Sequence, residues 1–421
     1  MNFIQFFTEG IKIAFAAIGA NRMRAVLTML GVGTGIFAIV GILTMVNSMQ
    51  TSITKNLSAL GNTTIFVHHW PWADNRNDWY KFINRPKVSY RDYQKLKQNL
   101  TRVEGVCYEV TVGGQTVRSD GRSISNVQLV GSTPDMSKVR DLKFTEGRYF
   151  SEVEQHLGSA VCIVGYNISD NLFPDGNSVG KYIRISGQRL MITGVMEKVG
   201  SNMLFGGASE DDKVYVPYSV LPKMFNLNAR NSEKVITIKA SHYEDLPYIE
   251  SETIGLIRVA RGLRPKVENN FAINKQEALM SQFDKMFGYL KTGGWFISIF
   301  SILIGGFSIG NIMYISVKER TREIGIQKAL GATKGFILYQ FVMEAVLICF
   351  MGGLIGLGFV FGIGALIQTA MNSLDLPLKV AFAFGDLMTG VGLSVFTGLV
   401  SGILPASMAA SLDPVNAIRQ A

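Results

Sequence analysis

The chain has 421 residues, of which 48% are hydrophobic and 17% are charged, and its formal net charge is +9. The apolar residues are gathered in a few long uncharged runs with the charges between them, which is typical of a membrane protein. Basic residues flank these runs, where they orient membrane helices, and no basic stripe or zinc-finger spacing is present. The composition therefore argues against both a purely soluble protein and a nucleic-acid-binding protein.

The first twenty residues predict an amphipathic helix. Apolar residues recur at helical spacing over residues 2–19, interrupted by Glu9 and Lys12. We expect this helix to lie on the inner leaflet, and the alternative is that it extends the first membrane span. The uncharged run that follows is too long for a signal-peptide core, so we expect it to be retained as an anchor.

Four stretches are long and apolar enough to cross a bilayer. They are Ala25–Val46, Gly293–Val317, about Phe336–Met371 and Leu387–Leu412. The third contains one carboxylate, Glu344, which costs a few kcal/mol inside a membrane unless it lies near the interface or is paired.

Lysine and arginine in the short segments beside the spans predict the orientation. They are concentrated before the first span, in the loop over residues 318–335 and after the fourth span. Both termini and that loop are therefore expected in the cytoplasm, with residues 47–292 on the other side of the membrane. The predicted parts are an amphipathic helix (1–20), the first span with an outward stalk (21–60), an extracytoplasmic core domain (61–274), a stalk and second span (275–318), a cytoplasmic loop helix (319–335), the third span (336–371), a short outer loop (372–386), the fourth span (387–412) and the C-terminus (413–421).

Small residues recur four positions apart in every span, a spacing that lets helix backbones approach closely in lipid. The pairs are Gly31 and Gly35, Gly306 and Gly310, Gly352 and Gly356, and Gly398 and Gly402. They favour a packed bundle and allow a dimer, although glycine is common in membrane helices in general.

The large outer segment predicts a mixed α/β domain. Short β-rich runs alternate with turn residues: Thr63–His68, Val106–Val112, Ser125–Val130, Ala160–Gly165, Tyr182–Ile185, Leu190–Val195, Lys213–Pro217 and Lys234–Ala240. Helices are expected at Ser89–Leu100, Tyr166–Leu172, Tyr243–Arg261 and Lys275–Leu290. The last is expected to continue into the second span, and no Gly/Ser-rich or Pro-rich linker interrupts either junction.

Residues for catalysis or metal binding are scarce. The sequence contains no GxxxxGK[ST] phosphate loop, HExxH, CxxC or GxSxG motif. His68 and His69 are adjacent, and neighbours on a strand point to opposite faces, so we predict no metal site there. Cys107 and Cys162 could pair outside the cell, but their spacing indicates no disulfide framework, and we expect two buried free thiols.

The charged loop between the second and third spans (Lys318–Phe336) predicts a short helix. Ile326, Ala329, Leu330 and Thr333 would share one face, and Gly331 would end the helix. Such a helix could lie on lipid or dock into a groove of a partner, and the residues alone do not separate the two.

The string REIGIQKALGATKGFILYQFVMEAVLICFMGGLIG (Arg322–Gly356) resembles the signature of MacB/FtsX-type ABC permeases, which form the type VII group. So do Asn21–Ile36 and Asp413–Arg419. In the large loop, Gly147–Glu154 and Leu172–Val195 are similar to the periplasmic core domain of that family. The resemblance covers nearly the whole chain in the family's order, and implies four transmembrane helices with a large α/β extracytoplasmic domain between the first two.

The resemblance implies that the loop helix is the coupling helix that seats on an ABC ATPase. The residues carried over are Arg322, Glu323, Ile324, Gly325, Lys328, Ala329, Gly331 and Ala332. Glu344 matches the family's glutamate early in the third span. The implied assembly is a permease homodimer that couples ATP hydrolysis to motion of the outer domain for export, with an adaptor and an outer-membrane channel left open.

The macrolide exporter carries its ATPase ahead of a helix like Phe3–Ile18, where this sequence starts. We therefore expect ATP and Mg²⁺ to be bound by a separate ATPase subunit, with no cofactor or catalytic residue in this chain. The alternatives within the superfamily are a lipoprotein-release permease (LolC/E-like) and a regulatory FtsX-like permease that controls a cell-wall hydrolase. The outer loop of the FtsX-like type is typically much smaller.

Overall fold

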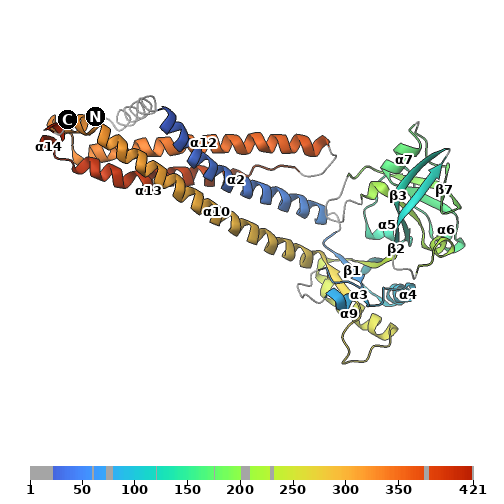
Figure 1. Ribbon diagram of the computed structural model, residues 1–421. Helices are drawn as coiled ribbons and strands as arrows, with labels where there is room; N and C mark the ends of the chain where they lie inside the picture. Colours follow the sequence, from blue (N-terminus) through green and yellow to red (C-terminus); the bar gives the residue numbers. More distant parts are fainter. Residues whose placement is uncertain are drawn as a thin grey trace. The chain divides into compact units, whose positions relative to one another are not determined.

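A computed structural model describes residues 22–58, 61–72, 79–119, 121–174, 176–200, 209–227, 232–373 and 379–419. The amphipathic helix expected over residues 1–20 lies outside these ranges. The chain divides into two compact units (Figure 1). We call them the helical unit, which holds residues up to Thr51, Lys285–Asn372 and residues from Leu378, and the sheet domain, which holds Ser52–Asp284.

The helical unit contains the four predicted spans. Four helices are long and apolar enough to cross a membrane: α2 (Arg22–Ser58), α10 (Gln276–Glu319), α12 (Lys334–Ser373) and α13 (Phe384–Ser411). The fold prediction is confirmed in this respect. The described residues of this unit also form two short helices, α11 (Thr321–Ala329) between α10 and α12, and α14 (Pro414–Arg419) after α13; α14 is labelled in Figure 1. Both α2 and α10 extend beyond the apolar runs, as the expected stalks require.

Glycine allows direct backbone contact between α2 and α12. A Cβ added at Gly356 would lie 2.4 Å from the carbonyl oxygen of Gly33, and one at Gly352 would lie 2.8 Å from that of Met29. Because no side chain separates the backbones, the helices pack at short range. Gly33 is not one of the eight predicted packing residues.

The predicted glycines occupy different surroundings. A Cβ at Gly398 or Gly402 would meet α12 at 2.7 Å, at Val346 and Ala345 respectively. Three others face neighbouring helices: a Cβ would lie 3.1 Å from Ser301 at Gly35, and 2.7 Å and 3.7 Å from Ser401 at Gly306 and Gly310. Gly31 differs, because a Cβ there would meet nothing within 4 Å.

Gly356→Leu is expected to lower the thermal stability of the helical unit, at a cost of about 2 kcal/mol, because the new side chain must push α2 away from α12. Gly358→Leu is the matched control, since Gly358 lies on the same helix and faces open space. Thermal unfolding of the purified chain in lipid nanodiscs measures the difference. Equal melting temperatures for the two variants would contradict the backbone contact.

The sheet domain is built on ten strands: β1 (Thr64–His68), β2 (Val103–Ser119), β3 (Arg122–Ser132), β4 (Phe144–Gly147), β5 (Val161–Val164), β6 (Tyr182–Ile185), β7 (Gln188–Met196), β8 (Lys213–Pro217), β9 (Ser232–Ala240) and β10 (Ala272–Lys275). The strand order is β10-β1-β9-β2-β3-β8-β5-β7-β4, and β6 pairs with both β2 and β7. The sheet is mixed, because β3–β8 and β5–β7 are parallel and the other pairs are antiparallel.

The sheet domain also contains short helices, several of which contact strands of the sheet. They are α3 (Trp79–Ile83), α4 (Tyr90–Asn99), α5 (Met136–Val139), α6 (Glu152–Leu157), α7 (Tyr166–Leu172), α8 (Leu221–Met224) and α9 (Leu246–Ala260). The described part of the domain also contains 3₁₀ turns at Glu210–Asp212, Tyr218–Val220 and Tyr243–Asp245. The α4 helix begins with a capping box, in which Ser89 and Asp92 each accept a hydrogen bond from the other's backbone N–H.

The long strand β2 departs from the sequence prediction, which ended it at Val112. The pair Gly113-Gly114 predicts a break, but the chain forms an irregular stretch between Val112 and Val117 and then pairs again with β3. An inserted residue of this kind bends a strand without ending it. Strands β4 and β10 were not predicted from the sequence.

Cys107 and Cys162 are unpaired and buried, as predicted, and Cys349 is unpaired and buried as well. Burial raises the pKa of the Cys107 thiol to about 12 and raises that of Cys162 further. Neither thiol ionises at neutral pH, so both behave as small apolar side chains.

The segment Gly147–Glu154 forms a second capped helix start. Arg148 donates two hydrogen bonds of 2.9 Å to the Glu154 carboxylate, which also accepts from the Ser151 backbone at 2.6 Å. The hydrogen bonds from Arg148 are the main cause that lowers the pKa of Glu154 from 4.5 to about 2.

Glu154→Gln is expected to destabilise the sheet domain by about 1–2 kcal/mol at neutral pH, after allowance for the exposure of Arg148. Because the folded pKa is depressed, this stability is complete above pH 4.5 and is lost as the pH falls from 4.5 toward 2. Melting temperatures of wild type and variant should therefore differ at pH 7 and converge near pH 2. A difference that is unchanged at low pH, or an equal effect of Glu152→Gln, would contradict the assignment.

Candidate docking site at one end of the helical unit

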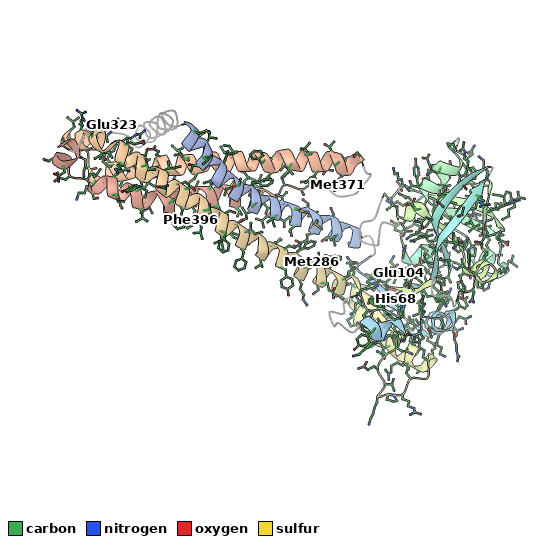
Figure 2. The ribbon with its side chains drawn as sticks, viewed as in Figure 1. His68, Glu104, Met286, Glu323, Met371 and Phe396 are labelled. Atoms are coloured by element: carbon green, nitrogen blue, oxygen red, sulfur yellow. The ribbon has the colours of Figure 1, made fainter. Side chains whose placement is uncertain are left out.

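The predicted loop helix exists as α11, and it lies at one end of the helical unit. Figure 2 shows Glu323 at that end and Met371 of α12 at the other. Glu323 is in the first turn of α11 and Lys328 in the last, so both charges favour the helix dipole.

Gly331 ends α11 as the sequence predicts. Its φ is +100°, a conformation that glycine adopts without strain. The N–H of Ala332 donates to the Gln327 carbonyl at 3.0 Å and the N–H of Gly331 to the Lys328 carbonyl at 3.1 Å. These two bonds form a Schellman motif. Thr333 then caps α12, since its Oγ1 accepts from the N–H of Phe336, and the turn between the helices is fixed.

Lys328 fastens α11 to the end of α13. Its Nζ donates to the carbonyl oxygens of Ala410, at 2.8 Å, and Leu412. The last carbonyls of a helix have no partner within that helix, so a lysine here satisfies them and complements the dipole. The α11 helix also packs against α14.

A second attachment joins the start of α11 to α12. Arg320 Nη1 lies 3.5 Å from the Glu344 carboxylate, and the Glu344 side chain is only 4% exposed. The sequence left interfacial exposure and pairing as alternatives for Glu344, and the structure shows pairing. Arg320 was missed, and the available signal was a basic residue in the loop that precedes a span with one carboxylate about two turns inside it.

The eight predicted coupling residues divide into two groups. Ile324 and Gly325 are buried in the helical unit, and Lys328 and Ala332 are partly buried. The exposed residues are Arg322, Glu323, Ala329 and Gly331. Only the second group offers side chains or backbone to a partner, whereas Ile324 and Lys328 hold the helix in place.

Apolar side chains extend this exposed face. Ile326 is 44% exposed and Leu330 is 84% exposed. They belong to the apolar face that the helical spacing predicts, but they were not among the predicted coupling residues. The exposed face of α11 thus combines two large apolar side chains with Arg322 and Glu323, a composition suited to a protein groove.

The expectation that His68 and His69 point to opposite faces of a strand is wrong. Strand β1 ends at His68, so His69 does not have to point to the opposite face, and the two rings lie 4.3 Å apart. With Glu233 they form a cluster whose possible ligand atoms all lie within 4.8 Å of one another. His68 Nε2 is 3.3 Å from Glu233, which Lys87 also approaches at 4.0 Å. Two neighbouring basic groups therefore already share this carboxylate.

An apolar groove of 540 Å³ runs along α10 and α13 within the helical unit. Its walls include Phe307 and Tyr314 of α10 and Phe396 and Leu404 of α13. Figure 2 places Phe396 midway along the unit. A surface of this kind suits lipid chains or another apolar helix.

Two family models match the chain. A MacB-like periplasmic core domain matches residues 25–254, and an FtsX-like permease C-terminal region matches residues 295–414. The first match alone covers more than half of the chain.

Curated relatives match nearly all of it. The chain is 29% identical over 415 residues to the macrolide export ATP-binding/permease protein MacB of Neisseria gonorrhoeae, covering 98% of this chain and 61% of that protein. It is 27% identical over 412 residues to the ABC transporter permease YknZ of Bacillus subtilis, covering 98% of each. The chain thus spans about three fifths of the length of the macrolide-export relatives that it matches.

Among solved structures, the periplasmic region of MacB from Actinobacillus actinomycetemcomitans matches with a TM-score of 0.43 and 16% identity, covering 55% of this chain and 97% of that one. The extracellular domain of YknZ matches with a TM-score of 0.39 and 18% identity, covering 50% of this chain and 98% of that one.

Proposed function

This chain belongs to the family of MacB/FtsX-type ABC transporter permeases, and on that premise we propose that it is the subunit through which a separate ATPase drives motion of the sheet domain for export or efflux. The proposal rests on the exposed side chains of α11 and on the attachment of its two ends. This helix exposes Glu323, Ile326 and Leu330, while Lys328 and Arg320 tie its two ends to the neighbouring long helices.

The proposed mechanism follows from these attachments. An ATPase that moves on binding and hydrolysing ATP would push on the exposed face of α11. Because Lys328 holds the end of α13 and Arg320 holds α12, displacement of α11 passes into two long helices. The long continuous helices α2 and α10 would carry the motion along the bundle. The work would then be done on the sheet domain, without a hydrophilic path through the apolar spans.

The proposed partner chain would bind ATP and Mg²⁺. Within these 421 residues no phosphate-loop motif occurs, and the nearest string, Gly176–Lys181, has the wrong spacing. We expect two copies of the permease in the assembly, and the exposed apolar surface along α10 and α13 supports a second copy packed in the membrane. The exporter relative suggests an amphiphilic small molecule as the cargo class.

The proposed orientation places α11 and both termini in the cytoplasm and the sheet domain outside the inner (plasma) membrane. It is supported by the basic residues concentrated beside α11 and before the first span. Membrane-impermeant thiol labelling of intact cells tests it, with cysteine placed at Leu330 or at Tyr248 on the sheet domain. Only the second position should react, and labelling at Leu330 would reverse the proposal.

A photo-crosslinking residue at Leu330 tests the ATPase contact. In membranes from cells that make the complete transporter, we expect a crosslinked product that mass spectrometry identifies as an ABC ATPase. The control position is Ile324 of the same helix, which is 2% exposed and should give no such product. Crosslinks from Leu330 to lipid alone would show that α11 lies on the membrane and would overturn the docking role.

A further inference from the structure

Three arginines from three neighbouring strands form a row on the sheet domain. Arg118 of β2 lies directly opposite Arg184 of β6, and Arg184 lies directly opposite Arg189 of β7. Directly opposed residues in antiparallel strands project from the same face, with Cβ atoms about 5 Å apart. We call Arg118, Arg184 and Arg189 the arginine row.

The register of the strands fixes this row. On either side of it, Val117, Ile183, Ile185 and Leu190 are buried in the core, while all three arginines are exposed. A shift of one residue in β6 would move its apolar side chains into solvent. The strands therefore cannot slip to separate the like charges.

Like charges directly opposite one another destabilise a sheet unless something neutralises them. No ion pair is present for any member of the row among the residues that the structure describes. Elsewhere in the sheet domain basic side chains have acidic partners, such as Asp92 for Arg261 and Glu154 for Arg148. The row is thus a concentration of positive charge that the described fold leaves without a counter-charge.

The arginine row lines a cavity of 1120 Å³. A fourth arginine, Arg122, lines it as well, together with hydroxyl and amide side chains and no described aspartate or glutamate. Contacts among the lining residues hold part of the cavity wall in position. The Arg189 guanidinium lies 3.8 Å from the centre of the Tyr182 ring, and Ser119 Oγ donates to the Tyr182 carbonyl at 2.8 Å. A ligand would therefore meet guanidinium groups that are already partly oriented.

We propose that this cavity binds a ligand that carries two neighbouring phosphate groups or one doubly charged phosphate. Neighbouring strands lie about 4.8 Å apart, so the whole row spans about 10 Å and can surround two phosphate groups, whereas two adjacent arginines suffice for one doubly charged phosphate. The planar fork of arginine donates two parallel hydrogen bonds to such oxygens. The phosphate can belong to a soluble diphosphate or to a lipid headgroup.

The test is isothermal titration of the full chain in nanodiscs of zwitterionic lipid, without ATPase or nucleotide, so that the result does not depend on the proposed function. Inorganic pyrophosphate probes the soluble source, and dihexanoyl phosphatidic acid probes the lipid source. We expect saturable binding of at least one. Pyrophosphate alone would assign a soluble ligand, the lipid alone would assign a headgroup, and both would assign the phosphate group itself. Binding of neither overturns the proposal.

Arg184→Gln removes the centre of the row and is expected to weaken binding by about tenfold or more. Arg184→Lys keeps the charge but loses the planar guanidinium with its two parallel N–H donors, so it should weaken binding to an intermediate degree. The control is Arg91→Gln, an exposed arginine of α4. Without ligand, the melting temperature of Arg184→Gln should equal or exceed that of wild type, because repulsion is relieved. Equal weakening by Arg184→Gln and Arg91→Gln would show general charge attraction and overturn the site.

Discussion

Replacing Glu323 with lysine is expected to abolish stimulation of the partner ATPase by this permease while leaving insertion into the membrane intact. Glu323 is exposed in the first turn of α11 and makes no ion pair among the described residues, so its carboxylate is available to a partner. Reversal of its charge places a cation where the docking surface presents an anion, and a misplaced charge at a protein interface costs several kcal/mol. The measurement is ATPase activity of the reconstituted complex, using the ATPase that the Leu330 crosslink identifies.

The matched control for Glu323→Lys is Glu152→Lys. Glu152 is also an exposed acidic residue in the first turn of a short helix, α6, so its replacement has the same effect on the helix dipole but lies in the sheet domain. Glu152→Lys should retain full stimulation. If Glu323→Lys retained it as well, α11 would have no role in coupling.

Arg140→Met is expected to destabilise the sheet domain by about 3 kcal/mol, because it leaves the buried Glu109 carboxylate without a cation. Arg140 lies 3.2 Å from Glu109 and 3.4 Å from Glu210, and the Glu109 side chain is only 9% exposed. Glu109 is the main cause that raises the pKa of Arg140. Burial by itself would raise the pKa of Glu210, but Arg140 and Lys213 outweigh it and lower that pKa. The Glu210 carboxylate is therefore held in the charged form.

A second substitution distinguishes loss of charge balance from loss of packing. Arg140→Met combined with Glu109→Gln removes the carboxylate that depends most on Arg140, so part of the lost stability should return. Denaturation followed by the fluorescence of Trp70 and Trp72, which lie in this domain, measures it. A double variant that is less stable than Arg140→Met alone would contradict this prediction.

The sequence predicts elements well where the pattern is local. Long uncharged runs are sufficient to place four spans, since a helix must be apolar along its whole length in lipid. Strand β6 and helix α7 were placed at their observed bounds because turn residues flank them. Ser89 and Gly331 were recognised from the chemistry of helix ends.

Long-range pairing could not be predicted. Arg320 and Glu344, or Lys328 and the Ala410 carbonyl, meet because helices pack, and no spacing rule connects them. The arginine row has the same origin, since Arg118 reaches Arg184 only through a strand pairing that joins distant segments. The backbone contact at Gly33 was missed for a related reason, as the regular four-residue spacing selected its neighbours Gly31 and Gly35 instead.

The contact of Gly33 with Gly352 and Gly356 also limits how this bundle can deform. Side chains can change rotamer to let two helices slide, but peptide groups in contact cannot. If the chain works as proposed, the α2 and α12 helices would therefore move together as one rigid body. Rearrangement has more freedom along the groove between α10 and α13, where long side chains bound a space of 540 Å³ that can widen or close without breaking backbone contacts.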